Sequence, residues 1–299
     1  MQTPRRLLLL RTLLRLYQDS GLQFIARTSG VLNLLKLKTT EQLLPEINKA
    51  TTFPEQKAFP AKVALFTGCS QTLFDSEVIA ATIKLLNALG IEVIIPAQQT
   101  CCGALHNLQG EYQQAASLIN NNENVFAQQG IDTVLYLSTG CGVFIKENYA
   151  SSVAFREITE YITSQLLSNL AFKSLEKTVA VHVPCTQTNV LHQADTTTPL
   201  IKNIPGIKLV SLAQHGCCGA GGTTMLKYPD MASEIRQPLL DKVIQDQCGL
   251  VVTTNPGCQL HLQAGFKNEK SMIKVMHPVT LLAQQLAECD LGDKRKNAE

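Results

Sequence analysis

Short runs of apolar residues alternate with longer amphipathic stretches from about residue 62 onward. The intervening stretches 76–89 and 111–129 have helical spacing, and each stops at a glycine, as helices often do. Strands that alternate with helices predict a parallel sheet covered by helices on both faces, and therefore an α/β fold. The apolar runs that we expect to form buried strands are 62–67, 91–95, 131–137, 178–183, 207–212 and 249–253.

The spacing of the cysteines shows that this pattern occurs twice. In each half a cysteine lies 32 residues before an adjacent cysteine pair, and another cysteine follows the pair after 39 or 40 residues. A glycine follows each pair directly. Repeats of this kind indicate two related structural units. The two sets are Cys69, Cys101, Cys102 and Cys141 in the first half, and Cys185, Cys217, Cys218 and Cys258 in the second.

The length of 299 residues is sufficient for two medium-sized units. We expect the first at 62–165 and the second at 175–288, each a small parallel sheet flanked by helices, followed by a polar tail at 289–299. Residues 1–61 differ in composition. Up to residue 49 they hold eight Arg or Lys against three Asp or Glu, and their leucines recur at helical spacing. This predicts a basic arm of two short amphipathic helices and a proline-containing linker.

Charge and hydropathy limit the surroundings of the protein. A net charge of +2 gives no indication of a nucleic-acid partner. The apolar run at 7–10 is interrupted by Arg11 and Arg15, so it is too short for a secretory signal or a membrane span. We therefore expect a cytoplasmic protein. Peripheral contact between the basic arm and the inner face of the membrane stays open.

All eight repeated cysteines follow directly after expected strands. The carboxyl ends of parallel strands lie at one edge of a sheet, where α/β proteins bind ligands. Each half should therefore bring its four thiols to one place. Adjacent cysteines on an extended strand would point to opposite faces. The glycines Gly103 and Gly219 permit a turn that directs both thiols to the same site.

Four thiolates in each half suit an iron–sulfur cluster. Cysteines acting only as small apolar residues would not need such regular spacing. Zinc also takes four thiolates, although structural zinc sites usually use two short C-x-x-C pairs. Metal-free disulfide chemistry at the adjacent pairs is a third interpretation, and both alternatives stay open. Cys248 and Cys289 lie outside the repeat and are taken as ordinary cysteines.

Four other polar residues lie near these cysteines. Ser138 and Asn255 each stand three residues before the closing cysteine, and we expect them to shape the turn rather than to bind metal. His106 and His215 lie close to the pairs and are candidates for hydrogen bonding to the site. The remaining acids and histidines form no acid–base or nucleophile constellation, so no catalytic residue is expected.

The chain resembles the cysteine-rich (CCG) domain family, most closely its branch of bacterial glycolate oxidase iron–sulfur subunits. The stretches that carry the resemblance are FTGCSQTLF, IPAQQTCCGALHNLQGE, GCGVFIKE, HVPCTQ, GCCGAGGTTML, VTTNPGCQLHL and VMHPVTLL. The resemblance implies that the eight repeated cysteines bind one or two iron–sulfur clusters of the 4Fe–4S kind. It also implies an electron-transfer subunit, without flavin of its own, of a 2-hydroxy-acid dehydrogenase complex. Such a subunit passes electrons from a flavoprotein partner to a quinone or another acceptor.

The sequence departs from this family in two places. Fully cysteinyl members, such as heterodisulfide reductase, close each group with C-x-x-C, whereas this chain has Ser138 and Asn255. No cysteine precedes Cys69, so the usual N-terminal ferredoxin module is expected on a separate chain or lost. A thiol/disulfide reductase subunit and an assembly scaffold without redox function are the alternative functions.

Overall fold

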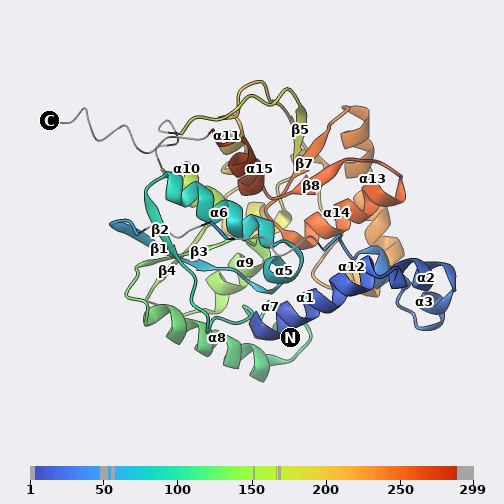
Figure 1. Ribbon diagram of the computed structural model, residues 1–299, viewed down its shortest axis with the longest axis horizontal. Helices are drawn as coiled ribbons and strands as arrows, with labels where there is room; N and C mark the ends of the chain where they lie inside the picture. The colour runs from blue at the N-terminus through green and yellow to red at the C-terminus, as the bar shows by residue number, and fades with distance from the viewer. Residues whose placement is uncertain are drawn as a thin grey trace.

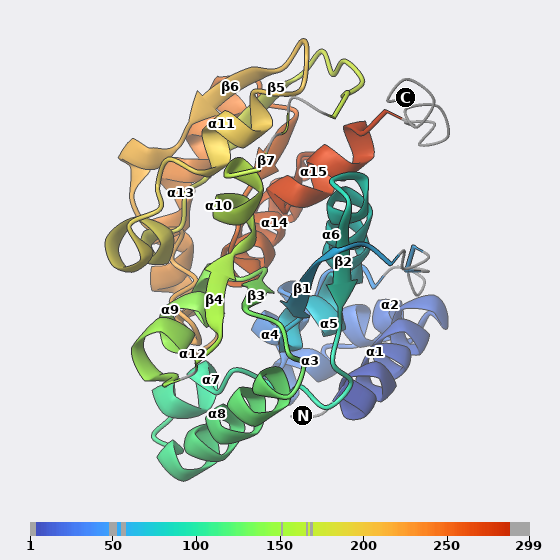
Figure 2. The ribbon, with the colours of Figure 1, turned by 90° about the vertical axis from the view of Figure 1, so that its left-hand side faces the viewer.

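The computed structural model of the chain describes residues 4–47, 53–54, 58–150, 152–165, 167 and 170–287. The expected tail at 289–299 lies outside the described residues. Two parallel sheets of four strands each, flanked by helices, form the body of the protein (Figures 1 and 2). This confirms the predicted α/β fold and its two repeats.

The first sheet has the strand order β2-β1-β3-β4, and all neighbours are parallel. Its central strands β1 and β3 coincide with apolar runs of the sequence, which explains why they are buried. The edge strand β4 was not predicted, because its sequence AFRE contains no apolar run. The strands are β1 (Ala61–Phe66), β2 (Ile91–Ile94), β3 (Thr133–Tyr136) and β4 (Ala154–Glu157).

The second sheet repeats this arrangement with the order β6-β5-β7-β8. In both sheets the first strand lies between the second and the third, so the strand order reverses beside it. Ligands of open parallel sheets bind beyond the carboxyl ends of the strands at such a point. The strands are β5 (Thr178–Val181), β6 (Lys208–Ser211), β7 (Leu250–Val252) and β8 (Lys274–Met276).

Helices follow the strands in both halves, as the alternating pattern predicted. Those of the first half are α5 (Cys69–Phe74), α6 (Ser76–Ala88), α7 (Ala104–Leu108), α8 (Tyr112–Ala127), α9 (Thr139–Asn148) and α10 (Ile158–Thr163). The second half contains the π-helix η2 (Gln187–Leu191), α11 (Thr197–Ile201), the 3₁₀ helix η3 (Ala213–His215), α12 (Thr224–Lys227), α13 (Pro229–Gln245), α14 (Pro256–Asn268) and α15 (Pro278–Gln285).

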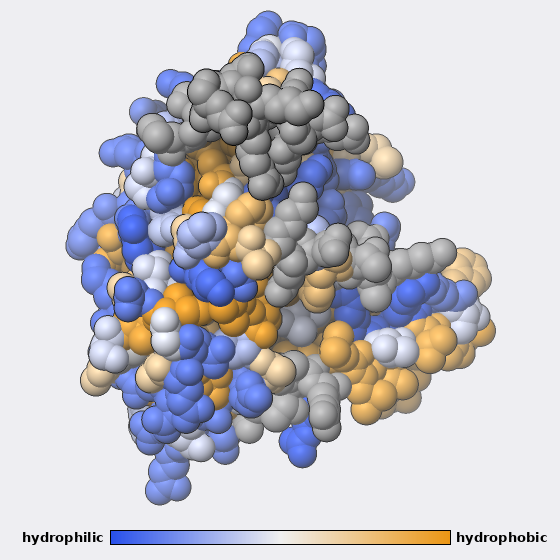
Figure 3. Space-filling view, turned by 60° about the vertical axis from the view of Figure 1, so that its left-hand side comes forward, coloured by the Kyte–Doolittle hydropathy of each residue, from blue (hydrophilic) through white to orange (hydrophobic). Residues whose placement is uncertain are grey.

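The N-terminal arm consists of α1 (Pro4–Asp19), α2 (Leu22–Thr28), α3 (Val31–Leu34) and α4 (Lys38–Gln42). The prediction of two short helices was therefore wrong. Gly21, Gly30 and Lys36 adopt positive φ angles of 80°, 76° and 54°, which interrupt the helical run three times. Helix α1 packs against α5 of the first half. Apolar side chains gather on the outside of the arm (Figure 3).

Among the described residues, no helix combines the length and the apolar character that crossing a membrane would require. This agrees with the interrupted apolar run at the start of the chain.

The two halves share one apolar core. Helix α6 of the first half packs against α15 of the second, and α10 packs against α11 (Figures 1 and 2). Leu86 of α6 and Leu282 of α15 are both fully buried in this shared cluster. Each half also has an outer core of its own, built around Phe126 in the first half and Phe266 in the second. The division into units at 62–165 and 175–288 remains a proposal.

Candidate functional site

The cysteines of the first half meet beyond the carboxyl ends of β1 and β3. Cys69 is the first residue of α5, which directly follows β1, and Cys141 lies in the first turn of α9, which follows β3. Cys101 and Cys102 lie in the loop between β2 and α7. The reversal of strand order beside β1 leaves this place free of crossover helices, so the three segments converge there.

The four thiols of the first half lie one beside the next, in the order Cys69, Cys101, Cys102 and Cys141. The Sγ atoms of Cys101 and Cys69 lie 3.8 Å apart, and Cys102 forms hydrogen bonds with both Cys101 and Cys141. Cys101, Cys102 and Cys141 are buried, whereas Cys69 is half-buried. The thiols therefore form one compact group with a single partly open side.

Gly103 produces the turn that brings the adjacent cysteines together. Its φ angle of 98° lies in the left-handed region. A β-carbon at this position would lie 3.1 Å from the ring of Phe144 and 3.3 Å from the carbonyl oxygen of Ala115. Both backbone conformation and space therefore require glycine here, as the sequence predicted.

The pKa values of the thiols in the first group are shifted in opposite directions. The pKa of Cys101 is well below its ordinary value, because Cys102 and Cys69 both form hydrogen bonds with its sulfur. The pKa of Cys69 is raised by its hydrogen bond to Cys101 and then by burial. The pKa of Cys102 is raised by its bonds to Cys101 and Cys141 and then by burial. A bound cation would stabilise all four thiolates, since coordination deprotonates a thiol.

The second group has the same origin in the fold but opens to the surface. Cys185 follows β5, Cys217 and Cys218 follow η3, and Cys258 lies in the first turn of α14. The Sγ atoms of Cys218 and Cys258 are 2.7 Å apart, and both residues are buried. Cys185 and Cys217 are exposed. The backbone N–H of Gly219 donates to the Cys217 sulfur at 3.3 Å, which is the kind of contact that tunes metal-bound sulfur.

The pKa values in the second group also reflect crowding of the thiols. The pKa of Cys217 is raised by its hydrogen bond with Cys218 and then by burial. Burial raises the pKa of Cys185, and the nearby charge of Cys217 adds to this shift. Each cysteine of the second half therefore interacts with the next, in the order Cys185, Cys217, Cys218 and Cys258. The cysteines of the first half form a similar series.

Ser138 and Asn255 cap the helices that carry the closing cysteines. Ser138 precedes α9, and its Oγ accepts a hydrogen bond from the Cys141 N–H at 3.4 Å. Asn255 precedes α14, and its Oδ1 accepts from the Gly257 N–H at 2.9 Å. Both residues thus shape the turn, as the sequence predicted.

The two histidines singled out in the sequence are differently placed. His106 lies against Glu111, with its Nδ1 2.6 Å from the Glu111 Oε2. His215 ends the short helix η3 just before the second pair and is half-buried. Cys248 is buried in the outer core of the second half, at the amino end of β7, whereas Cys258 lies beyond the carboxyl end of that strand.

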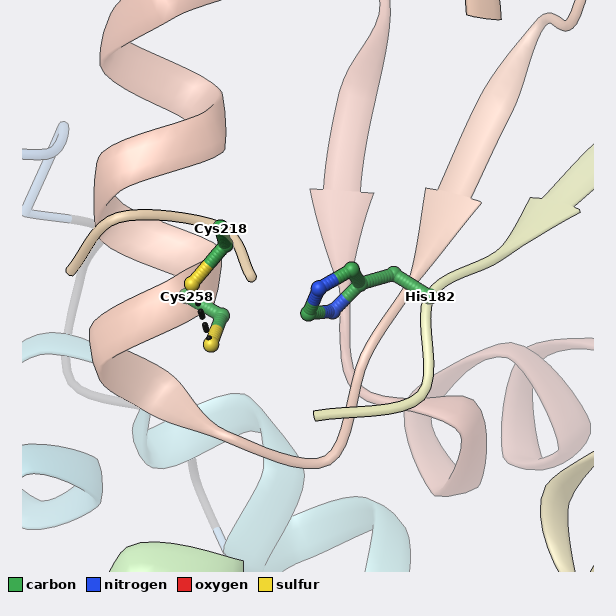
Figure 4. Close-up of side chains that lie close together, drawn as sticks. All are labelled: His182, Cys218 and Cys258. Atoms are coloured by element: carbon green, nitrogen blue, oxygen red, sulfur yellow. Dashed lines mark hydrogen bonds between the residues drawn. The ribbon is translucent and has the colours of Figure 1, made fainter. Parts of the chain in front are cut away.

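His182 was missed by the sequence analysis and lies against the second group. It is 2% exposed, and its Nδ1 lies 2.9 Å from Oγ1 of Thr253. Its ligand nitrogen and the sulfurs of Cys218 and Cys258 all lie within 4.8 Å of one another (Figure 4). A comparison of the two repeats could have pointed to His182. It stands three residues before Cys185, and the equivalent residue of the first half, three residues before Cys69, is Phe66.

The donor chemistry of these groups fits a thiolate-bound metal centre. The first group offers only sulfur atoms, which suit an iron–sulfur cluster or zinc. The second offers sulfur and one buried imidazole. The arrangement can therefore hold a metal centre, and its chemistry is that of the bound group.

Fold and cysteine geometry together define a protein with two related cysteine-rich α/β repeats. The chain belongs to the cysteine-rich domain (CCG) family, which matches residues 63–146 and 179–263. Residues 1–44 match the linker region of the glycolate oxidase iron–sulfur subunit. This confirms the resemblance drawn from the sequence motifs.

Two curated relatives illustrate the family. A probable glycolate oxidase iron–sulfur subunit of Bacillus subtilis is 29% identical over 91% of this chain and 68% of its own length. An uncharacterized iron–sulfur protein of Methanocaldococcus jannaschii is 30% identical over 84% of this chain and 53% of its own length. The chain thus spans about two thirds of one relative and about half of the other.

Among solved structures, a hypothetical protein from Helicobacter pylori has a similar fold. The TM-score is 0.55 at 12% sequence identity, and the match covers 82% of this chain and 53% of that one. At this identity the likeness concerns the fold alone.

Proposed function

We propose that this chain is an iron–sulfur electron-transfer subunit of an oxidoreductase complex. The observation that supports the proposal most directly is the convergence of four thiols beyond the carboxyl ends of the strands in each half. Several thiolates close together are costly unless a cation stabilises their charge, and a bound metal centre supplies that charge. An iron–sulfur cluster bound there would accept and release single electrons.

In this proposal each half binds one cluster through its four cysteines. The first cluster would be held by the wholly sulfur-containing group on the first sheet. The second would be held by the group that opens to the surface at Cys185 and Cys217, which suits electron exchange with a partner. We propose a cluster of the 4Fe–4S kind in each. The ligands are Cys69, Cys101, Cys102 and Cys141, and Cys185, Cys217, Cys218 and Cys258.

The proposed partner is a flavoprotein that oxidises a 2-hydroxy acid such as glycolate. Electrons would pass from its flavin through this chain to a quinone or another acceptor. The support comes from the Bacillus relative, named as a probable glycolate oxidase iron–sulfur subunit, and from the linker match at residues 1–44. A separate ferredoxin-like chain would complete the path.

A single metal ion in the first group is the second candidate. Tetrahedral zinc with Zn–S bonds of about 2.3 Å places its sulfur ligands about 3.8 Å apart. The Sγ atoms of Cys69 and Cys101 are separated by 3.8 Å, which fits one pair of zinc ligands. The set of three donors within 4.8 Å of one another among the described residues, however, is His182, Cys218 and Cys258 of the second group. A zinc centre would assemble the protein without transferring electrons.

Metal analysis of anaerobically purified protein tests the proposal. We expect iron and acid-labile sulfide in the full chain. Cys102→Ala and Cys218→Ala should each remove about half of the iron, and the double variant should remove nearly all of it if the sites are independent. Cys248→Ala is the matched control, because Cys248 is buried outside both groups.

Four results would contradict the proposal in whole or in part. Zinc without iron would favour the single-ion alternative. A protein free of metal that reduces a disulfide would favour thiol chemistry, and one without either property would favour a scaffold. If only one of the two cysteine variants lost iron, the other half would be purely structural.

A further inference from the structure

The two repeats differ at one buried position beneath the cysteines. In the first half, Phe66 of β1 is the register partner of Tyr136 of β3. The equivalent positions in the second half, displaced by 116 and 117 residues, are His182 and Thr253. His182 extends the ladder of β5, since its N–H donates to the carbonyl of Val252 at 2.9 Å. An aromatic pair is thus replaced by a hydrogen-bonded polar pair.

The imidazole of His182 has one nitrogen satisfied and the other directed at sulfur. Nδ1 pairs with Thr253 Oγ1. Nε2 is buried and has no hydrogen-bond partner among the described residues. A buried polar atom without a partner destabilises the folded state. Figure 4 shows the ring of His182 facing Cys218 and Cys258. A metal ion bound at Nε2 of His182 would satisfy this atom.

Metal binding by His182 depends on which of its ring nitrogens carries the proton. A neutral imidazole carries one proton, and a hydrogen bond at one nitrogen determines which nitrogen keeps a free lone pair. If Nδ1–H donates to the Thr253 hydroxyl, the lone pair on Nε2 points towards the two sulfurs. Metal-binding histidines are commonly oriented by such a bond at their other nitrogen.

We infer that His182 is a metal ligand through Nε2, which gives the second centre mixed nitrogen and sulfur ligation. The inference rests on the proposed function, because it assumes that the second group holds a metal centre. His182 thereby supplies a fifth donor to the second half. Asn255, at the other candidate position, is engaged in capping α14. The first half offers no equivalent nitrogen, since Phe66 occupies that position.

The two centres should therefore differ in redox behaviour. The identity of the ligands is one of the factors that set the reduction potential of an iron–sulfur centre, and the second centre would carry an imidazole donor that the first lacks. One repeated fold would thus hold two electronically different sites.

Pulsed EPR on the full chain, with and without ¹⁵N-labelled histidine, tests the inference. We expect strong hyperfine coupling to a directly bound nitrogen, with a shift on ¹⁵N labelling. His182→Phe, which copies the first half at this position, should abolish that coupling. It should also release metal from the second site to a chelator about tenfold faster or more. His106→Asn is the matched control and should leave the coupling unchanged. Metal-edge X-ray absorption gives the same information for a diamagnetic centre.

The outcomes separate this inference from the proposed function. Bound metal without a directly coordinated nitrogen in the native protein would overturn the role of His182 and leave the iron–sulfur proposal standing. Weak coupling, typical of an N–H donor to sulfur, would overturn it equally. Because the native protein is measured first, a folding defect in His182→Phe cannot decide the result. A protein that binds no metal would overturn both proposals.

Discussion

Single residues position the closing cysteine of each group. Ser138 and Asn255 adopt extended backbone conformations and accept hydrogen bonds from the first turns of α9 and α14. Those turns contain Cys141 and Cys258, so the caps fix the direction in which these two sulfurs point. The oxygen atoms of both caps are already engaged with backbone N–H groups, which argues against a ligand role.

Ser138→Ala and Asn255→Ala should each lower the free energy of unfolding by about 1 kcal/mol, the usual effect of losing a cap. Bound iron and the EPR line shape should change little. Denaturant unfolding and metal analysis check both expectations. Asn255→Asp keeps the cap and serves as the control. A marked loss of iron in an alanine variant would show that an oxygen atom binds the metal and that four sulfurs are too few.

Glu157 shows how a single buried acid sets a dependence on pH. It is fully buried at the end of β4, where its Oε2 caps α10 by accepting from the N–H groups of Thr159 and Glu160 at 2.7 and 3.0 Å. Its Oε1 has no partner in the part of the chain that the structure describes. Desolvation raises the pKa of Glu157 from 4.5 to about 7, although the bonds from Thr159 oppose the shift.

Between pH 4.5 and about 7 the folded protein retains a proton that the unfolded chain has released. The contribution of Glu157 to stability is therefore present below pH 4.5 and lost as the pH rises through 7. Glu157→Gln does not titrate, so its stability relative to the native protein should increase with pH across this window. The increase should be about 3 kcal/mol at most.

Unfolding measurements from about pH 4.5 to pH 8 would show this difference, with Glu160→Gln as the control at a neighbouring half-buried acid. Parallel pH profiles for the native protein and Glu157→Gln would mean that Glu157 is ionised in the folded state. In that case its buried charge would need a partner elsewhere.

At the scale of elements, α15 connects the two halves through its first residue and its cap. His277 caps α15, and its Nδ1 accepts from the Val279 N–H at 3.2 Å. Its Nε2 donates to the Leu137 carbonyl at 3.1 Å, beyond the end of β3 in the first half. The same helix packs along α6. One histidine thus joins a helix start in one half to a strand end in the other.

His277→Ala removes a cap and leaves the buried Leu137 carbonyl without its donor. We expect the free energy of unfolding to fall by about 2–4 kcal/mol. His277→Asn can still cap the helix but is too short to reach Leu137, so it should recover about 1 kcal/mol. Chemical denaturation followed by circular dichroism measures both. Equal stability of His277→Ala and the native protein would mean that packing of α15 alone joins the halves.

At the scale of the whole molecule, the arm presents an apolar surface that the body does not cover. Phe24 is 71% exposed and Leu34 is 82% exposed. Arg15 and Arg27 are engaged in ion pairs with Asp19 and Glu41. Lys36 and Lys38, beside Leu34, are exposed as well. An exposed apolar face fits a protein partner, and together with basic side chains it also fits a lipid surface. We propose the first, with the flavoprotein as the partner.

Phe24→Ser together with Leu34→Ser should reduce recovery of the flavoprotein with this chain by tenfold or so, about 1.4 kcal/mol of binding free energy. Bound iron should not change. Met272→Ser is the matched control, since Met272 is 90% exposed but lies in the second half. Undiminished co-purification would contradict the assignment. Binding of the native protein, but not the variant, to anionic vesicles would instead favour a membrane role.

The sequence by itself determined where the two groups of cysteines lie. Apolar runs predicted three of the four strands in each sheet, β1 to β3 and β5 to β7. The cysteines follow those runs at matched intervals. Strand position is a local property of the pattern, and parallel strands place their ends at one edge. The turn glycine Gly103 and the caps Ser138 and Asn255 were also predicted, because turn chemistry depends on neighbouring residues.

Only the tertiary structure decided which residues from distant segments meet. The edge strands β4 and β8 have mixed polar sequences, such as AFRE and KVM, and pairing with a buried neighbour makes them strands. The core shared by α6 and α15 depends on contacts about 200 residues apart, as the bond from Lys84 to the Ala283 carbonyl shows. His182 lies beside Cys218 and Cys258 because β5 and β7 pair in register. No local periodicity encodes such a pairing, since it arises when the whole sheet closes around its core.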